Sequence, residues 1–152
     1  MNAAALVAFL HHLAAFTVVA ALAVEVTLFR PPLSLAQARR LQVTDLVFGT
    51  SAAAVHLVGL LRVMYFEKGP HYYWHDAYFI VKFSAFIAAG LISIYPTVTF
   101  LAWGSAIRAG VVPAVSPERV LRVRLCLVLE LTAIVIILLC ASLMARGFGT
   151  FG

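Results

Sequence analysis

Eight ionisable side chains lie inside long apolar stretches of the sequence, where a charge is costly and therefore points to function. They are His11, His12, Glu25, Asp45, His56, Arg62, Lys82 and Glu130. At about 1.5 Å per helical residue, His11 and His56 lie at nearly one depth, roughly 12–15 Å below the same surface. Two imidazoles at one level on neighbouring helices can ligate a haem iron from both sides. We therefore expect His11 and His56 to bind one b-type haem.

His12 is the alternative to His11 as a haem ligand. Adjacent residues on a helix point about 100° apart, so only one of the two histidines can face the site. Small residues near the histidines leave room for a flat macrocycle, namely Ala14, Ala15, Gly49, Ser51, Ala52, Ala53 and Gly59. Arg62 or Lys82 would reach the haem propionates. The same residues also fit a bundle without a cofactor, because membrane histidines hydrogen-bond across helices and small residues let helices approach closely.

Glu130 stands alone in an otherwise uncharged run that extends from Leu125 to Ala145. A lone carboxyl group at membrane depth is protonated unless it is paired. Lys82, Arg62 or a bound cofactor could be the partner of Glu130. We therefore take Lys82 and Glu130 as the candidate catalytic residues.

Glu25 and Asp45 form a second layer, nearer the opposite surface. Arg122 and Arg124 open the last apolar segment at about the same level. Long cationic side chains can reach the interface from this depth. We expect these four residues to form ion pairs that fix helix orientation rather than to take part in catalysis.

His71 and His75 have the i, i+4 spacing of a helical metal pair. A metal site would need a third ligand, and Asp76 and Met64 are the candidates near by. The surrounding tyrosines and Trp74 are instead typical of the membrane–water interface. Interfacial histidines are therefore the favoured interpretation.

The composition tells which class of protein must position these residues. The chain has 152 residues, of which 64% are hydrophobic and 11% are charged, and its formal net charge is +5. Globular chains average about 45–50% apolar and about 25% charged residues. So much apolar surface on so short a chain must be covered by lipid. These figures exclude a disordered chain, an ordinary soluble domain and a nucleic-acid-binding tail.

Four apolar segments are each long enough to cross a hydrocarbon core of about 30 Å. They span residues 3–29, 43–66, 75–103 and 118–145. Pro31 and Pro32 end the first segment, and Pro96 should kink the third. Ser116 followed by Pro117 is typical of a helix start. We expect residues 1–152 to form one transmembrane domain, an all-α antiparallel four-helix bundle with short loops.

The basic residues predict the orientation of the bundle. They concentrate in the first and third connections, as Arg30, Arg39, Arg40, Arg108, Arg119, Arg122 and Arg124. In the second connection, Lys68 is offset by Glu67 and Asp76. Because cytoplasmic loops carry the excess of Lys and Arg, the first and third connections should be cytoplasmic. Both termini would then face the outer, periplasmic side of a bacterial inner membrane.

The early run Leu-His-His-Leu-Ala-Ala-Phe, residues 10–16, resembles an uncharacterised family of predicted four-helix bacterial membrane proteins. More distantly, His11, the pattern Trp74-His75-x6-Lys82 and the pattern Arg122-x7-Glu130 resemble the bacterial four-helix protoporphyrinogen IX oxidase of the HemJ type. That resemblance implies a b-type haem and oxidation of a porphyrinogen with electrons passed to a quinone. The sequence departs from the oxidase pattern in the wide spacing of His75 and Lys82 and in the residue before Glu130.

Two functions of different classes follow from these residues. The first is a haem-binding membrane redox protein, an oxidoreductase with a porphyrin or quinone as partner. The second is a small accessory or structural subunit of a larger membrane complex, or of a homo-oligomer, with no cofactor of its own. A transporter is less favoured, because the sequence has no repeated half with broken helices.

Overall fold

The computed structural model describes residues 2–151, and these residues are almost entirely helical. The elements are α1 (Ala3–Leu28), α2 (Leu35–Leu61), the π-helix η1 (Arg62–Phe66), α3 (Pro70–Trp74), α4 (Ala77–Ala102), α5 (Gly104–Arg108) and α6 (Pro117–Ala145). Between residues 2 and 151 the extended pairing is a single isolated bridge, from Asp76 to Thr150. The chain is therefore an all-α protein, as predicted.

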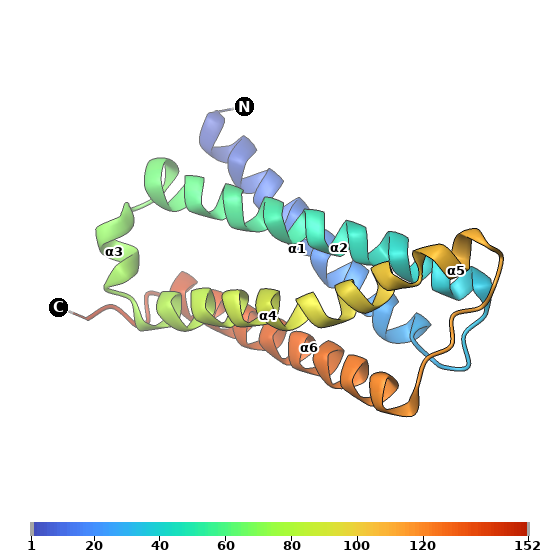
Figure 1. Cartoon of the computed structure of the whole chain (residues 1–152). Helices are drawn as coiled ribbons and strands as arrows, with labels where there is room; N and C mark the ends of the chain where they lie inside the picture. The colour runs from blue at the N-terminus through green and yellow to red at the C-terminus, as the bar shows by residue number, and fades with distance from the viewer. Residues whose placement is uncertain (1, 152) are drawn as a thin grey trace.

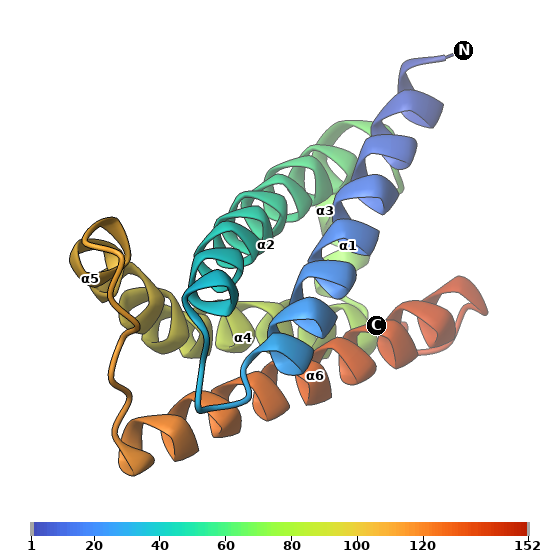
Figure 2. The same ribbon diagram turned by 90° about the vertical axis from the view of Figure 1, so that its right-hand side faces the viewer.

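Four helical spans are long and apolar enough to cross a membrane: Ala3–Leu28, Leu35–Phe66, Ala77–Arg108 and Pro117–Ala145. α1 packs along α2, and α4 packs along α6, so the chain forms two pairs of long helices. α3 connects the pairs at one end of the molecule, which we call the α3 end, and α5 lies at the other, the α5 end (Figure 1). Figure 2 shows the α1/α2 pair crossing the α4/α6 pair rather than running parallel to it. The predicted four-helix membrane bundle is confirmed.

α2 begins at Leu35, eight residues before the predicted start at Val43. The Ser34 hydroxyl accepts the backbone N–H of Gln37 at 3.2 Å, and the Gln37 side chain accepts the N–H of Ser34 at 2.8 Å. This reciprocal capping box satisfies two otherwise free donors and starts the helix there. The apolar run predicts a later start because the first turns of α2 carry arginines. Leu41 on the inner face of these turns is nevertheless completely buried.

α4 begins after Asp76, whose carboxylate accepts the N–H of Phe79 at 3.0 Å, and it ends at Ala102. The predicted third segment, 75–103, differs from this by one or two residues at each end. Pro96 lies inside α4, and Figure 1 shows a bend in the yellow part of that helix. α6 starts at Pro117 with Ser116 as N-cap, as the sequence pattern indicated.

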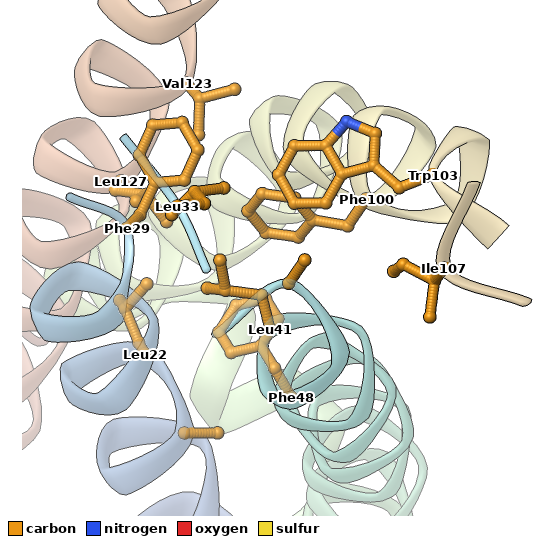
Figure 3. Close-up of a cluster of buried hydrophobic side chains, with 12 residues drawn as sticks. Leu22, Phe29, Leu33, Leu41, Phe48, Phe100, Trp103, Ile107, Val123 and Leu127 are labelled. Carbon is orange, nitrogen blue, oxygen red and sulfur yellow. The ribbon is translucent and has the colours of Figure 1, made fainter. Parts of the chain in front are cut away.

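The hydrophobic core lies at the α5 end of the molecule. Leu22 and Phe29 of the first helical pair meet Phe100 and Trp103 of the second, and Val123 and Leu127 of α6 close the cluster (Figure 3). The Phe100 ring centroid lies 5.8 Å from that of Phe29 and 5.0 Å from that of Trp103. Beyond this cluster, toward the α3 end, small residues of α2 and α4 line a cavity that is open on one side.

Candidate functional site

A cavity of about 430 Å³ lies between the two helical pairs, and all four long helices line it. Its wall is mainly apolar and contains several small residues, namely Gly49, Ala52 and Ala53 of α2 and Ala89, Gly90 and Ser93 of α4. His56 and Glu130 are the two ionisable residues in this wall. An apolar pocket of this size with a few polar groups is typical of small-molecule sites.

His56 lies in the α2 wall of the cavity against aromatic residues of α4. Its ring is stacked on Phe86, with centroids 5.8 Å apart and planes only 10° from parallel. Phe83 lies at the same centroid distance, tilted by 31°. Helical spacing brings Phe83 and Phe86 to one face of α4, so that they hold the imidazole from one side. Sequence reasoning did not single out these two phenylalanines, although their i, i+3 spacing was a usable signal.

Glu130 reaches the cavity from α6 and is only 1% exposed. Neither of its carboxyl oxygens has a hydrogen-bond partner among residues 2–151. The partners suggested by the sequence are engaged elsewhere: Arg62 forms an ion pair with Glu67, and the Lys82 ammonium lies 5.3 Å from the centroid of the Phe79 ring. The expected pairing of Glu130 with Arg62 or Lys82 is therefore wrong.

His11 and His12 are separated by the rotation of α1, which the sequence left open. His12 is exposed on the lipid-facing side, whereas His11 is half-buried against α2. A Cβ atom on Gly59 would lie 3.2 Å from Cε1 of His11, so the imidazole packs directly on this glycine. The His11 imidazole lies near the Val55 backbone, but its buried Nδ1 makes no hydrogen bond of good geometry within the described chain. Of the two histidines, His11 is the one that faces the interior.

The two predicted haem ligands lie at different helix interfaces. His11 packs between α1 and α2 and does not line the cavity, whereas His56 packs between α2 and α4. Their depths are similar, because His11 lies beside Val55 and Gly59, which flank His56 on α2. To ligate one iron, both imidazoles would have to leave these packing positions. Their pairing remains a prediction.

Glu25 and Asp45 do not form the ion pairs expected at the α5 end. The described residues contain one ion pair, between Arg62 and Glu67. Arg122 and Arg124 are both exposed, because they flank Val123, which is completely buried and turns them outward. Glu25 is 1% exposed and Asp45 is 6% exposed, so both carboxyl groups lie inside the bundle without a cation.

The second connection holds His71 and His75 as a stacked pair with ring centroids 4.2 Å apart. Nδ1 of His75 lies 2.7 Å from the carbonyl oxygen of His71. Asp76 is occupied as the N-cap of α4 and does not complete a metal site. Within residues 2–151 no group of three or more His, Cys, Asp or Glu side chains is placed to hold a metal ion.

The chain end closes this connection, a feature that the sequence did not reveal. The N–H of Ala77 donates to the Gly149 carbonyl at 2.9 Å, and the N–H of Phe151 donates to the His75 carbonyl at 2.9 Å. Gly149 has a φ of +102°, which only glycine adopts readily. A Cβ atom there would also collide with Tyr78. The C-terminal segment thereby covers Asp76, which is 1% exposed.

A family model described as "Predicted membrane protein (DUF2214)" matches residues 3–149. The chain belongs to the DUF2214 family. The match covers all four long helices and confirms the resemblance to an uncharacterised membrane protein family. No curated protein and no solved structure matches the chain. For this DUF2214 protein, a function is therefore inferred from the side chains that line the cavity.

Proposed function

We propose that the protein is a membrane redox protein whose cavity takes a flat, lipid-soluble ring system, either a tetrapyrrole or a quinone. The observation that carries this proposal is the cavity wall, in which His56 and the unpartnered Glu130 are the only ionisable residues. An imidazole and a carboxyl group can each donate or accept a hydrogen bond, as the carbonyls of a quinone or the pyrrole nitrogens of a porphyrin require. The remaining wall is apolar and suits the ring itself.

A b-type haem is the tetrapyrrole that the sequence favours, and the imidazole of His56 would hold it. This imidazole lies in the cavity wall, and small residues beside it leave space for the macrocycle. The haem would supply one-electron exchange at iron, while the chain positions the ligand and excludes water. The buried, unpartnered Nδ1 of His11 makes that residue the candidate second ligand, after a movement of its ring away from Gly59.

Two cations near His11 support an acidic ligand. Arg62 and Lys82 both lie close enough to His11 for their charges to act on it. Their position toward the α3 end suits the propionate groups of a haem or porphyrin. The half-buried Lys82 and the buried Glu130 are the candidate groups for proton transfer to the ligand.

Absorption spectra of the detergent-purified protein, oxidised and then reduced with dithionite, test the haem form of this proposal. We expect a Soret band that His56→Ala abolishes or strongly shifts. His71→Ala is the matched control, because His71 lies in α3, outside the cavity, and should leave the spectrum unchanged. A wild-type protein without a Soret band, or His56→Ala with an unaltered low-spin spectrum, would contradict haem ligation at His56.

Tryptophan fluorescence tests the quinone form. The Trp74 ring lies 5.9 Å from Phe83, which in turn contacts His56, so Trp74 reports on the cavity once Trp103 is replaced by phenylalanine. A short-chain benzoquinone should quench Trp74, and Gly90→Leu should weaken the quenching by filling the cavity. Equal quenching in both proteins would show that the quinone binds elsewhere.

The sequence resemblance to the HemJ-type oxidase would add an activity to this site, namely porphyrinogen oxidation with electrons passed to a quinone. The resemblance rests on His11, Lys82 and Glu130, of which Glu130 lines the cavity. The test is formation of fluorescent porphyrin from porphyrinogen under anaerobic conditions with added quinone. A protein that binds haem but forms no porphyrin above the Glu130→Gln background would not be an oxidase of this kind.

A second candidate is the accessory-subunit function, which the many exposed large apolar side chains on the long helices favour. Helices of a partner could cover part of this apolar surface, as suits a protein without its own cofactor. This function predicts a colourless isolated chain and co-purification with a larger complex from the native membrane.

We also propose the bacterial inner membrane as its location, with both termini on the outer side. The support is the concentration of arginine in the connections at the α5 end. Single cysteines at Gln37 and Ala109, introduced after replacement of Cys126 and Cys140, should be protected from an impermeant thiol reagent in intact cells. Labelling of both positions would reverse the orientation.

A further inference from the structure

Three buried carboxyl groups lie together inside the bundle. Glu25 comes from α1, Asp45 from α2 and Glu130 from α6, and all three are buried. Leu22 and Phe48, one turn from Glu25 and Asp45 on their helices, line the same cavity as Glu130. On the other side, Phe29 and Leu127 line one groove, so the three carboxyl groups lie at about one level inside the bundle. The Thr97 hydroxyl of α4 donates to Asp45 at 2.8 Å, so all four long helices meet at this point. We call Glu25, Asp45 and Glu130 the carboxyl triad.

The triad has no compensating cation. No basic residue is among the groups whose charges act on Glu25 or Glu130. One oxygen of Glu25 and both oxygens of Glu130 have no hydrogen-bond partner among the described residues. The other titratable side chain near by is the Cys126 thiol, which lies one turn before Glu130 on α6. Three uncompensated charges in a low-dielectric interior would repel one another strongly, so carboxyl groups in this arrangement share protons.

Independently of these charges, the triad lies between two depressions in the structure, a cavity on one side and a groove on the other. Glu130 belongs to the wall of the interhelical cavity toward the α3 end. Toward the α5 end there is a groove of about 280 Å³. It begins about one helical turn from Glu25 on α1 and about one turn from Glu130 on α6. It is lined by Val26, Phe29, Arg30, Arg124, Leu127 and Val128. Its two arginines, Arg30 and Arg124, are both exposed at the surface of the bundle.

We propose that the carboxyl triad is a proton relay between the cavity and the surface at the α5 end. In each step a carboxylic O–H of one member breaks as a new O–H forms on a neighbouring carboxylate, without any change in electron number. Glu130 exchanges protons with the cavity, and Asp45, held by Thr97, exchanges them with the glutamates. Glu25, next to Val26 of the groove wall, passes them toward the groove. The relay would deliver or remove the protons that accompany reduction or oxidation of the ligand, and in that role it rests on the proposed function.

Infrared spectroscopy of the protein in lipid nanodiscs tests the relay without any ligand. Protonated carboxyl groups give C=O bands that shift when the proton is replaced by deuterium, and Glu130→Gln identifies the band of Glu130 by its loss. After transfer to D2O, we expect the Glu130 band to shift in the wild type. Glu25→Gln and Asp45→Asn should each slow that shift by about tenfold, the effect of about 1.4 kcal/mol on a barrier. Glu118→Gln, an exposed carboxyl change in the first turn of α6, is the matched control and should have no effect.

Each variant is first checked for helicity and thermal stability, and Asp45→Asn carries the test if Glu25→Gln does not fold. Glu25→Asp, which keeps the carboxyl group, should restore exchange. An unchanged exchange rate in both amide variants would overturn the relay, as would a Glu130 band that never exchanges in the wild type. Loss of the protonated bands on addition of sodium ions would instead make the triad a cation site. Because no haem or quinone is needed, these outcomes are independent of the ligand tests above.

Discussion

The two ends of the bundle are built for different purposes. At the α5 end, Phe29, Phe100 and Trp103 pack ring against ring and join the two helical pairs. Toward the α3 end, the pairs are separated by a cavity, and the potentially reactive side chains His11 and His56 lie there. Burial follows the same division, since the buried residues of α1 and α2 all lie in the halves nearest α5.

This difference indicates that one end holds the fold and the other leaves space for a ligand. In lipid the hydrophobic effect does not drive helices together, so close packing has to hold the pairs. A dense cluster at one end is enough to fix two helical pairs that are each stable within themselves. The opposite end is then free to keep small residues and unpartnered polar groups, which close packing would not tolerate.

Truncation of a buried side chain at the α5 end should have the largest effect on the free energy of unfolding. Phe100→Ala removes a completely buried ring and should lower the free energy of unfolding by about 3 kcal/mol, the lower end of the range for buried phenylalanine, because unfolded helices remain in lipid. Phe16→Ala is the matched control, since Phe16 is 73% exposed on α1. Unfolding in mixed micelles, followed by circular dichroism, measures both. Equal losses would mean that the α5 end does not hold the pairs together.

A substitution in the cavity should instead raise the free energy of unfolding. Glu130→Leu replaces two unpartnered, buried oxygens with an apolar side chain and should raise stability by about 1–3 kcal/mol, the cost of an unsatisfied buried group. The same unfolding assay measures this gain. Ligand binding and proton exchange at the cavity should be lost at the same time. A destabilised Glu130→Leu protein would indicate that the carboxyl group has a structural partner.

Two glycines away from the α5 end, Gly90 and Gly59, should differ in how much stability an alanine substitution adds. A Cβ atom added to Gly90 meets nothing within 4 Å, so Gly90→Ala should stabilise α4 by about 1 kcal/mol through its higher helix propensity. Gly59→Ala has the same propensity gain, but its Cβ would press on His11 at 3.2 Å. We therefore expect a smaller gain or a loss for Gly59→Ala in a melting-temperature comparison of the two variants. Equal gains would show that the imidazole of His11 is not fixed against α2.

The sequence was sufficient for the helices but not for their rotation. Long apolar runs identify spans wherever they occur, and Ser116 before Pro117 located the start of α6 correctly. In a membrane helix, however, the lipid-facing side is as apolar as the packed side, so no amphipathic pattern shows which residues face inward. His11 and His12 could not be distinguished for this reason.

The capping and the candidate site show the same limit. Ser34 and Gln37 form a capping box whose pattern is visible in the sequence, whereas the apolar run alone predicts a later start for the second helix. Glu25 and Asp45 were recognised as one layer, yet pairing them with arginines assumed a rotation of α6 that burial of Val123 excludes. Which carboxyl groups meet depends on packing between helices far apart in the sequence, and no local pattern encodes it.

The smallest expected effect lies outside the membrane spans, at Tyr73 in α3. Burial raises the pKa of the Tyr73 phenol above its usual value, and the nearby negative charge of Glu67 raises it further. Because the folded protein disfavours the tyrosinate, this contribution to stability is present below about pH 10, the ordinary tyrosine pKa. It is lost as the pH rises from there through the folded pKa. Ultraviolet titration should show one tyrosine ionising late, and Tyr73→Phe should remove that step. Glu67→Gln should shift it to lower pH, whereas an unshifted step would mean that the charge of Glu67 does not reach α3.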